Sequence, residues 1–334
     1  RLLTVTGVQT CALPICYLLD GRICYQPLGD LRRDASLVVL SNENKMICNP
    51  FYQMHPGSGR VAFWGHGGNL QGQADSLRER WKRHFARHVD WWFGYTAHSL
   101  PLLERIGFER ERTTILNNSI DMQGLQACLH QTRSVGRSTI RDRLDIPEGS
   151  FVGLLMGSLY KEKRLDFLLE AGRRLRQQQP GFVLLIAGAG PDDALIREAA
   201  RSSPWIRHLG ALHDQAKSEV LVAADVMVNP GLVGLGILDG FAAGLPMVTT
   251  DCHLHSPEIA YLQPGQNGLI TNNTLEDFVA GVLQLHPDGT MHPQLSRASR
   301  LSAEQYSLER MSQRFAKGIQ DCLAAPPRAR SSNH

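Results

Sequence analysis

The residues best placed to do chemistry lie in the stretch 229–246, which reads NPGLVGLGILDGFAAGLP. Residues 221–228 are apolar and predict a buried strand, Pro230-Gly231 breaks it, and an apolar helix is expected from Leu235 to Ala243. This order puts unpaired backbone N–H groups at a helix N-terminus, where phosphate or sugar oxygens bind well. Asp239 lies one turn inside, so its carboxylate leans toward such a ligand. The alternative is an ordinary strand-to-helix turn with one exposed aspartate.

Two more glycine turns follow predicted strands in the same half of the chain. The strand 151–156 leads into Gly157 and Ser158, and the strand 182–187 leads into the turn 188–191, GAGP, with Gly188 and Gly190. Three cations follow the first of these turns: Lys161, Lys163 and Arg164. Cations opposite a helix N-terminus can hold a diphosphate and stabilise the charge that develops on a nucleotide leaving group. Glycosyl transfer from a nucleotide sugar requires that chemistry.

A histidine marks a further candidate site. The predicted strand 61–64 ends in the turn 65–69, GHGGN, which carries His66. Glycines beside a histidine at a strand end let backbone and ligand approach closely. The alternative is that His66 is a structural turn residue.

A rival site of different chemistry lies after the next predicted strand. Asp251, Cys252, His253 and His255 alternate in one loop, which is a weak metal-ligand pattern. The seven cysteines otherwise show no CxxC pair and no zinc spacing, which favours a reduced cytosolic compartment. We expect His255 instead to belong to the loop that lines the ligand cleft, with no metal bound.

Composition describes a globular chain. The chain has 334 residues, a length that is enough for two domains with full cores. Of these residues, 43% are hydrophobic and 20% are charged. The formal charge of +3 is small for this size and argues against nucleic acid as a partner. No apolar run approaches the roughly 20 residues of a membrane span. A cytoplasmic protein is expected.

One helix could still touch a membrane surface. The pattern predicts a helix over 75–88 with an apolar stripe and a basic face. Such a face could contact anionic lipid headgroups at the inner side of a membrane, whereas the alternative is a solvated surface. The cations of this face are Arg78, Arg80, Lys82, Arg83 and Arg87.

Strands and helices alternate along most of the chain, which predicts α/β architecture with parallel, doubly wound sheets and ligands at the C-terminal strand ends. We expect a first domain over 17–130, a second over 131–300, a C-terminal helix over 301–323 that packs back toward the first domain, and a disordered tail over 324–334. Residues 1–16 resemble translated sequencing-adapter read-through and are left out of the fold. On that interpretation the first domain is truncated at its N-terminus.

Four motifs in order resemble the retaining glycosyltransferases of family 4, which have the two-domain GT-B fold. That family commonly reads EGFGLVVLEAMACGKPVV where this chain has 231–248, GLVGLGILDGFAAGLPMV, without gaps. It reads GRL and EKG.D where this chain has 157–159 and 162–166, and PNGVD where it has 117–121. It reads G..PE and DG.NGLL where this chain has 256–258 and 264–269. The resemblance covers most of 34–322 and implies two Rossmann-like domains that face a cleft.

The resemblance also assigns roles. The family's first glutamate, which contacts the donor sugar, falls on Gly231, and its second, which binds the ribose hydroxyls, falls on Asp239. The position of the family's phosphate-binding arginine is occupied here by Ser158. The resemblance therefore leaves Lys163 as the cation that binds the diphosphate, with Lys161 or Arg164 as possible substitutes. A bacterial subgroup with GHG and PGxVGL motifs implies that His66 faces the donor sugar. Backbone and side-chain donor contacts are expected from Gly157, Gly188, Gly190, Gly231, Val233, Gly234, Leu235 and Glu258.

The expected activity is transfer of a sugar from a nucleoside-diphosphate sugar to a glycan or lipid-linked acceptor, as in cell-surface polysaccharide synthesis. The family implies retention at the anomeric carbon and no metal or other cofactor. Two other classes stay open: another GT-B enzyme, such as a sugar-nucleotide epimerase or a phosphorylase, or a decayed nucleotide-sugar-binding protein.

Overall fold

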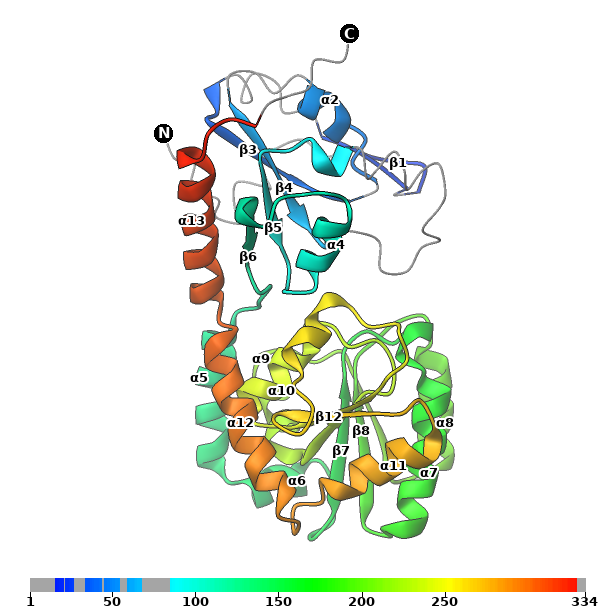
Figure 1. The fold of residues 1–334 in the computed structure, drawn as a ribbon. Coiled ribbons are helices and arrows are strands. Elements are labelled where there is room, and N and C mark those ends of the chain that lie inside the picture. The colour runs from blue at the N-terminus through cyan, green and yellow to red at the C-terminus, as the bar shows by residue number, and fades with distance from the viewer. Residues whose placement is uncertain are drawn as a thin grey trace. The chain divides into compact units, whose positions relative to one another are not determined.

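The computed structural model describes residues 16–20, 22–26, 34–43, 45–54, 59–67 and 85–328. The chain forms two compact units (Figure 1). Unit 1 comprises 1–117 with 311–334, and unit 2 comprises 118–310. The interpretation of 1–16 falls, except for Cys16, outside the described residues.

Unit 1 is built on a four-stranded parallel sheet in the order β3-β4-β5-β6. Its strands are β3 (Leu37–Ser41), β4 (Arg60–Gly65), β5 (Trp91–Gly94) and β6 (Thr113–Ile115). A short antiparallel pair of strands, β1 (Cys16–Leu18) and β2 (Ile23–Tyr25), precedes this sheet in the sequence. The helices described in this unit include α2 (Asn49–Met54), α4 (Ser99–Arg105), the 3-10 turn η2 (Arg110–Arg112) and most of α13 (Leu308–Ala324).

Each face of the unit 1 sheet buries its own apolar core. Phe63 and Trp92 point to one face, where Leu103 of α4 packs against the same cluster. Phe93 points to the other face and meets Phe315 of α13 with ring centroids 4.6 Å apart. From Met311 onward, the last helix therefore packs in the core of the first unit.

Unit 2 contains a six-stranded sheet in the order β12-β11-β10-β7-β8-β9, and every neighbouring pair is parallel. The strands are β7 (Phe151–Met156), β8 (Phe182–Ala187), β9 (Ile206–Gly210), β10 (Val226–Val228), β11 (Met247–Thr250) and β12 (Gly268–Thr271). The longer helices are α5 (Met122–Val135), α6 (Arg137–Arg143), α7 (Leu165–Gln178), α8 (Asp193–Ser202), α9 (Asp214–Ala223), α10 (Gly236–Ala243), α11 (Leu275–Gln284) and α12 (Met291–Gln305).

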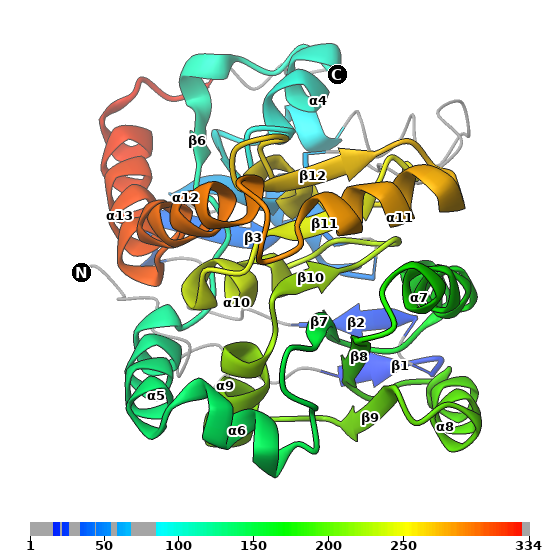
Figure 2. The same cartoon turned by 90° about the horizontal axis from the view of Figure 1, so that it is seen from below.

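Helices cover both faces of this sheet (Figure 2). Leu155 of β7 points to the face covered by α7, α8 and α11, whereas Leu154 points to the face covered by α5, α6, α9 and α10. Strands buried on both faces read as continuous apolar runs, which is why β7 and β8 were predicted with their observed bounds.

The strand order reverses beside β7. The chain adds β8 and β9 on one side of β7 and then crosses to add β10, β11 and β12 on the other. The carboxyl ends of β7 and β10 therefore flank a topological switch point, which is where open α/β sheets bind ligands.

Several expected bounds need correction. The strand predicted over 221–228 begins only at Val226, because Leu221 and Ala223 belong to α9 and pack in the core as helical residues. The helix α2 begins at Asn49, shortly after Met46, which forms a bridge with Cys24.

The domain limits also differ from those expected. The units divide after Asn117 and not at 130/131, because Leu125 and Leu129 of α5 pack in the unit 2 core. The helix expected over 301–323 is two helices, α12 and α13, that break at 306–307. The tail 324–334 was expected to be disordered, but its residues up to Arg328 are placed. The Arg328 guanidinium lies 4.7 Å from the centre of the Phe108 ring.

Candidate functional site

The three glycine turns of unit 2 meet at the carboxyl ends of β7, β8 and β10. Gly157 N–H donates to the Ala187 carbonyl at 2.9 Å, and Leu159 N–H donates to the Ala189 carbonyl at 3.0 Å. A Cβ at Gly188 would lie 1.8 Å from the Gly157 carbonyl oxygen, so this loop contact requires a glycine. A Cβ at Gly190 would lie 2.1 Å from the Leu159 carbonyl oxygen. The turns after β7 and β8 thus form one close-packed backbone surface.

The third turn packs against the cations that follow β7. Leu232 N–H donates to the Glu162 carbonyl at 2.8 Å. A Cβ at Gly231 would stand 2.2 Å from that same Glu162 oxygen and 2.7 Å from the Lys163 carbonyl oxygen. Any side chain at 231 would collide with backbone, so the position that carries a glutamate in the family resembled must here be glycine.

Lys163 is the buried cation of the site. It belongs to the 3-10 turn η3 (Lys161–Lys163), and its Nζ donates to the Leu232 carbonyl at 2.6 Å. Burial lowers the pKa of Lys163 to about 8. An ammonium has three hydrogens, and this carbonyl uses one of them. The Nζ also lies 4.0 Å from where a Cβ of Gly157 would stand, so Lys163 lies between the turns after β7 and β10.

Open backbone donors lie at the start of α10. In this fully described segment, the N–H groups of Gly234, Leu235 and Gly236 have no hydrogen-bond partner. The Val233 N–H is engaged, because it donates to His255 Nδ1 at 3.2 Å. Of the backbone N–H groups predicted to contact the donor, that of Val233 is therefore occupied by His255. The N–H groups of Gly234 and Leu235, together with that of Gly236, can donate to an anion.

Asp239 lies in the first turn of α10 and is buried. Burial raises its pKa, and the Lys217 ammonium, 2.6 Å from Asp239 Oδ1, opposes that rise. Lys217 lies in the first turns of α9, the helix that precedes β10. No sequence pattern singles out Lys217, because a lysine on a polar helix face gives no signal until the neighbouring helix is placed.

The two other predicted cations have different surroundings. Arg164 Nη1 donates to Thr250 Oγ1 at 2.9 Å and to the Pro230 carbonyl at 3.0 Å, and its guanidinium lies over Phe167. It therefore ties together the ends of β10 and β11, which favours a structural role. Lys161 and Ser158 are exposed at the mouth of the same turn.

Glu258 is placed by unit 2 alone. It sits in the first turn of the 3-10 helix η4 (Pro257–Tyr261), is buried, and accepts from Asn118 Nδ2 at 3.4 Å. The Tyr261 hydroxyl donates to the Asn118 carbonyl at 2.9 Å and fixes that partner. These contacts orient the Glu258 carboxylate as an acceptor.

The rival metal site does not assemble. The ring of His255 bonds the Val233 N–H through Nδ1, and its Nε2 lies 2.7 Å from the Thr250 carbonyl. Asp251 and His253 form a separate exposed pair at 3.4 Å. Among the described residues no group of three or more acidic, histidine or cysteine side chains could hold a metal ion.

His66 belongs to unit 1. It follows β4 with an exposed side chain, and its ring meets the Tyr95 ring edge-on at 4.5 Å. Gly67 has φ +83°, and a Cβ there would press on Leu103 at 3.0 Å, so the turn needs its glycine. The role of His66 toward a donor stays a prediction.

The predicted basic helix lies mostly outside the described residues, which include Arg87 but not Arg78, Arg80, Lys82 and Arg83. Arg87 is exposed. None of the helices in the described part of the chain combines the length and apolar content that crossing a bilayer requires.

The two α/β units with parallel sheets give the chain the GT-B fold. It superposes on the crystal structure of Anabaena Alr3699/HepE in complex with UDP with a TM-score of 0.70 and 14% identity, over 87% of this chain and 80% of that chain.

Residues 150–288 match the family model described as glycosyl transferases group 1, and these residues contain the three glycine turns, Lys163 and Asp239. The alpha-monoglucosyldiacylglycerol synthase of Acholeplasma laidlawii is 25% identical over 203 residues, 59% of this chain and 49% of the relative. The phosphatidyl-myo-inositol mannosyltransferase of Mycobacterium tuberculosis is 29% identical over 131 residues, 36% of this chain and 35% of the relative. The chain thus spans about half or less of the length of these relatives. The matches support a group 1 glycosyltransferase domain in unit 2.

Proposed function

We propose that this protein transfers a sugar from a nucleoside-diphosphate sugar to a lipid-linked or glycan acceptor. The observation that carries the proposal is the grouping, at the switch point of the unit 2 sheet, of the Lys163 ammonium with the open N–H groups of 234–236. A buried cation and a helix N-terminus together suit a diphosphate.

In this mechanism the bond between the anomeric carbon and the diphosphate oxygen breaks, and the acceptor hydroxyl oxygen bonds to the anomeric carbon. The hydroxyl proton leaves to solvent or to the departing phosphate. Lys163 and the α10 N-terminus stabilise the negative charge that gathers on the nucleoside diphosphate. The resemblance to family 4 implies retention at the anomeric carbon. The proposed mechanism uses no metal ion.

The remaining donor contacts are assigned by position. Asp239 accepts hydrogen bonds from the ribose hydroxyls, and Glu258 accepts them from the sugar. Gly231 supplies close backbone approach where the family has a glutamate. His66 keeps its predicted role toward the donor sugar.

A lipid-linked acceptor is the first choice for testing. The two curated relatives have names that denote a glucosyldiacylglycerol synthase and a phosphatidylinositol mannosyltransferase. UDP is the first nucleotide to test, because the HepE structure holds it. Enzymes with lipid acceptors work at a membrane surface, which agrees with the predicted basic face over 75–88.

The test is a panel of nucleotide sugars incubated with diacylglycerol and phosphatidylinositol vesicles, with release of nucleoside diphosphate and formation of glycolipid both measured. Product that requires both donor and acceptor supports the proposal. Sugar isomerisation without acceptor would indicate an epimerase, and a requirement for inorganic phosphate would indicate a phosphorylase. Donor binding with no turnover on any acceptor would indicate a binding protein and overturn the transferase.

A further inference from the structure

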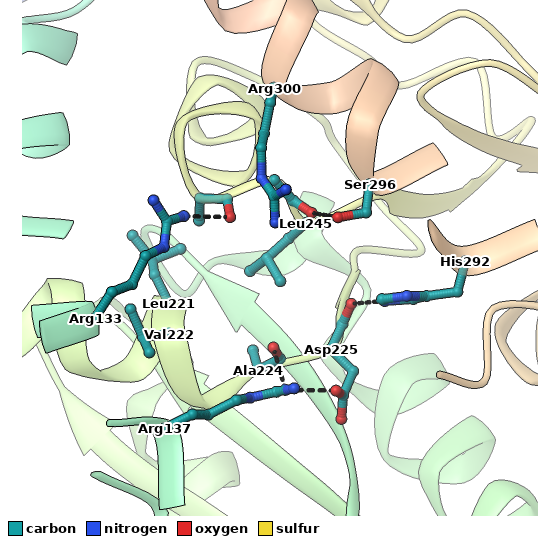
Figure 3. A pocket seen from close by; sticks show the side chains of 12 residues that line it. Arg133, Arg137, Leu221, Val222, Ala224, Asp225, Leu245, His292, Ser296 and Arg300 are labelled. Carbon is teal, nitrogen blue, oxygen red and sulfur yellow. Dashed lines mark hydrogen bonds and ion pairs between the residues drawn. The ribbon is translucent and has the colours of Figure 1, made fainter. Parts of the chain in front are cut away.

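A second group of cations lies at the amino ends of β10 and β11, at the opposite end of the unit 2 strands from the glycine turns. A pocket of about 200 Å³ opens there (Figure 3). Arg133 of α5, Arg137 of α6 and Arg300 of α12 enter it from separate helices. Asp225 directly precedes β10, whereas the nucleotide site follows it, so the two sites occupy opposite ends of the same strands.

The charges of this pocket do not balance. Among its lining residues, all of which the structure describes, Asp225 is the single carboxylate. That carboxylate is already engaged, because Arg137 pairs with Oδ1, and Arg141, which does not line the pocket, pairs with Oδ2 at 2.9 Å. Its third bond is from the Val152 N–H at 2.8 Å. Asp225 therefore cannot neutralise the remaining two arginines.

Arg133 and Arg300 are left facing the pocket as like charges. Arg133 Nη2 donates to the Ala243 carbonyl at 2.8 Å, which leaves its other donors for a ligand. Arg300 has no hydrogen bond or ion pair with any described residue, and a Cβ at Gly244 would lie 2.3 Å from its Nε. Burial, and then the charge of Arg300, lower the pKa of Arg133. Two like charges that face one pocket without a counter-charge are stabilised by a bound anion.

We propose that this pocket binds a phosphomonoester or phosphodiester anion. Three arginines against one aspartate leave two positive charges, which matches the charge of roughly −1.5 to −2 on a phosphomonoester at neutral pH. Guanidinium groups on separate walls suit the several oxygens of a phosphate better than the two of a carboxylate. The volume is below the roughly 300 Å³ at which pockets for drug-sized ligands begin, so the ligand is a small ion or a headgroup. This proposal is independent of the nucleotide-sugar chemistry.

The experiment measures the melting temperature of the full chain in sodium phosphate and in sodium chloride at equal ionic strength, with excess UDP present to fill any nucleotide site. Phosphate is expected to raise the midpoint by roughly 2–4 °C at concentrations well above its dissociation constant. Arg300→Gln is expected to abolish this rise, and Arg300→Lys to keep part of it. The matched control is Arg297→Gln, an exposed arginine one turn away on α12 that does not line the pocket.

Equal phosphate stabilisation of wild type, Arg300→Gln and Arg297→Gln would overturn the proposal, as would no stabilisation of any of them. A second measurement identifies the source of the phosphate. Sedimentation with phosphatidylglycerol vesicles that is lost in Arg300→Gln and kept in Arg297→Gln would assign a lipid headgroup. Phosphate stabilisation without sedimentation would assign a soluble phosphate. Because Arg300 is exposed, we expect the variant to fold, and an unchanged midpoint in chloride would verify it.

Discussion

Gly231 packs so closely on Glu162 that a Cβ on the glycine would lie 2.2 Å from the glutamate's carbonyl oxygen. The Leu232 N–H donates to the same oxygen, so the loop after β10 is joined to the turn that carries Lys163. This contact explains why the acidic side chain of the family resembled is absent. The same approach brings the Lys163 ammonium to the Leu232 carbonyl, beside the N-terminus of α10.

The first prediction follows from that contact. Gly231→Ala is expected to destabilise the protein by roughly 1–3 kcal/mol or more, because backbone must shift to admit the methyl group. Gly234→Ala is the control in the same loop, since the nearest atoms to its Cβ would be 3.8 Å away. Urea unfolding measures both free energies. Equal midpoints for the two variants would show that the loop is free to move away from Glu162.

The second prediction concerns Asp239. If its carboxylate binds the ribose, Asp239→Asn should weaken UDP binding roughly 10- to 100-fold, the usual loss for a hydrogen bond to a charged group. The same substitution should leave the affinity of 2′,3′-dideoxy-UDP unchanged, since that analogue lacks the hydroxyls. Calorimetry with both ligands measures this. A purely structural Asp239 would change the two affinities alike.

Lys217 supplies the third prediction, because it is 2.6 Å from Asp239 Oδ1. Lys217→Met leaves a buried carboxylate without its partner and should cost roughly 1–3 kcal/mol of unfolding free energy. The loss should shrink in the double variant Lys217→Met/Asp239→Asn, in which neither charge remains. Additive losses in urea unfolding would mean that the two residues do not interact.

The sequence predicted the central strands of unit 2 well, because burial on both faces makes them continuous apolar runs. Strands such as 151–156 and 182–187 are apolar on both faces, and the three glycine turns follow them directly, so both the sheet and its ligand edge could be inferred.

Long-range contacts could not be inferred in this way. The pairing of Lys217 with Asp239 and the steric need for Gly231 depend on how separate turns pack, and no local pattern encodes that. The boundary at Asn117 was missed for the same reason: α5 looks like a polar linker helix until Leu125 and Leu129 are seen in the unit 2 core. The cation pocket likewise brings Arg300 of α12 to Arg133 and Arg137, which are close to each other in sequence but distant from Arg300.

The last prediction concerns pH and Lys163. Because burial lowers its pKa to about 8, Lys163 is charged at pH 7 and loses its proton as the pH rises through 8. If Lys163 holds the diphosphate, it does so in the charged form, so UDP affinity should fall roughly tenfold between pH 7 and pH 9. The charge of the ligand's terminal phosphate, which has a pKa of roughly 6, changes little over that range.

Two variants separate this lysine from its neighbour in the same turn. Lys163→Met keeps the apolar stem and should bind UDP roughly 10- to 100-fold more weakly at pH 7, with little further loss up to pH 9. Lys161→Met removes an exposed cation two residues away and should retain the wild-type pH profile. If Lys161→Met instead flattened the profile, the diphosphate cation would be Lys161, and the buried ammonium at 163 would serve only to hold the Leu232 carbonyl.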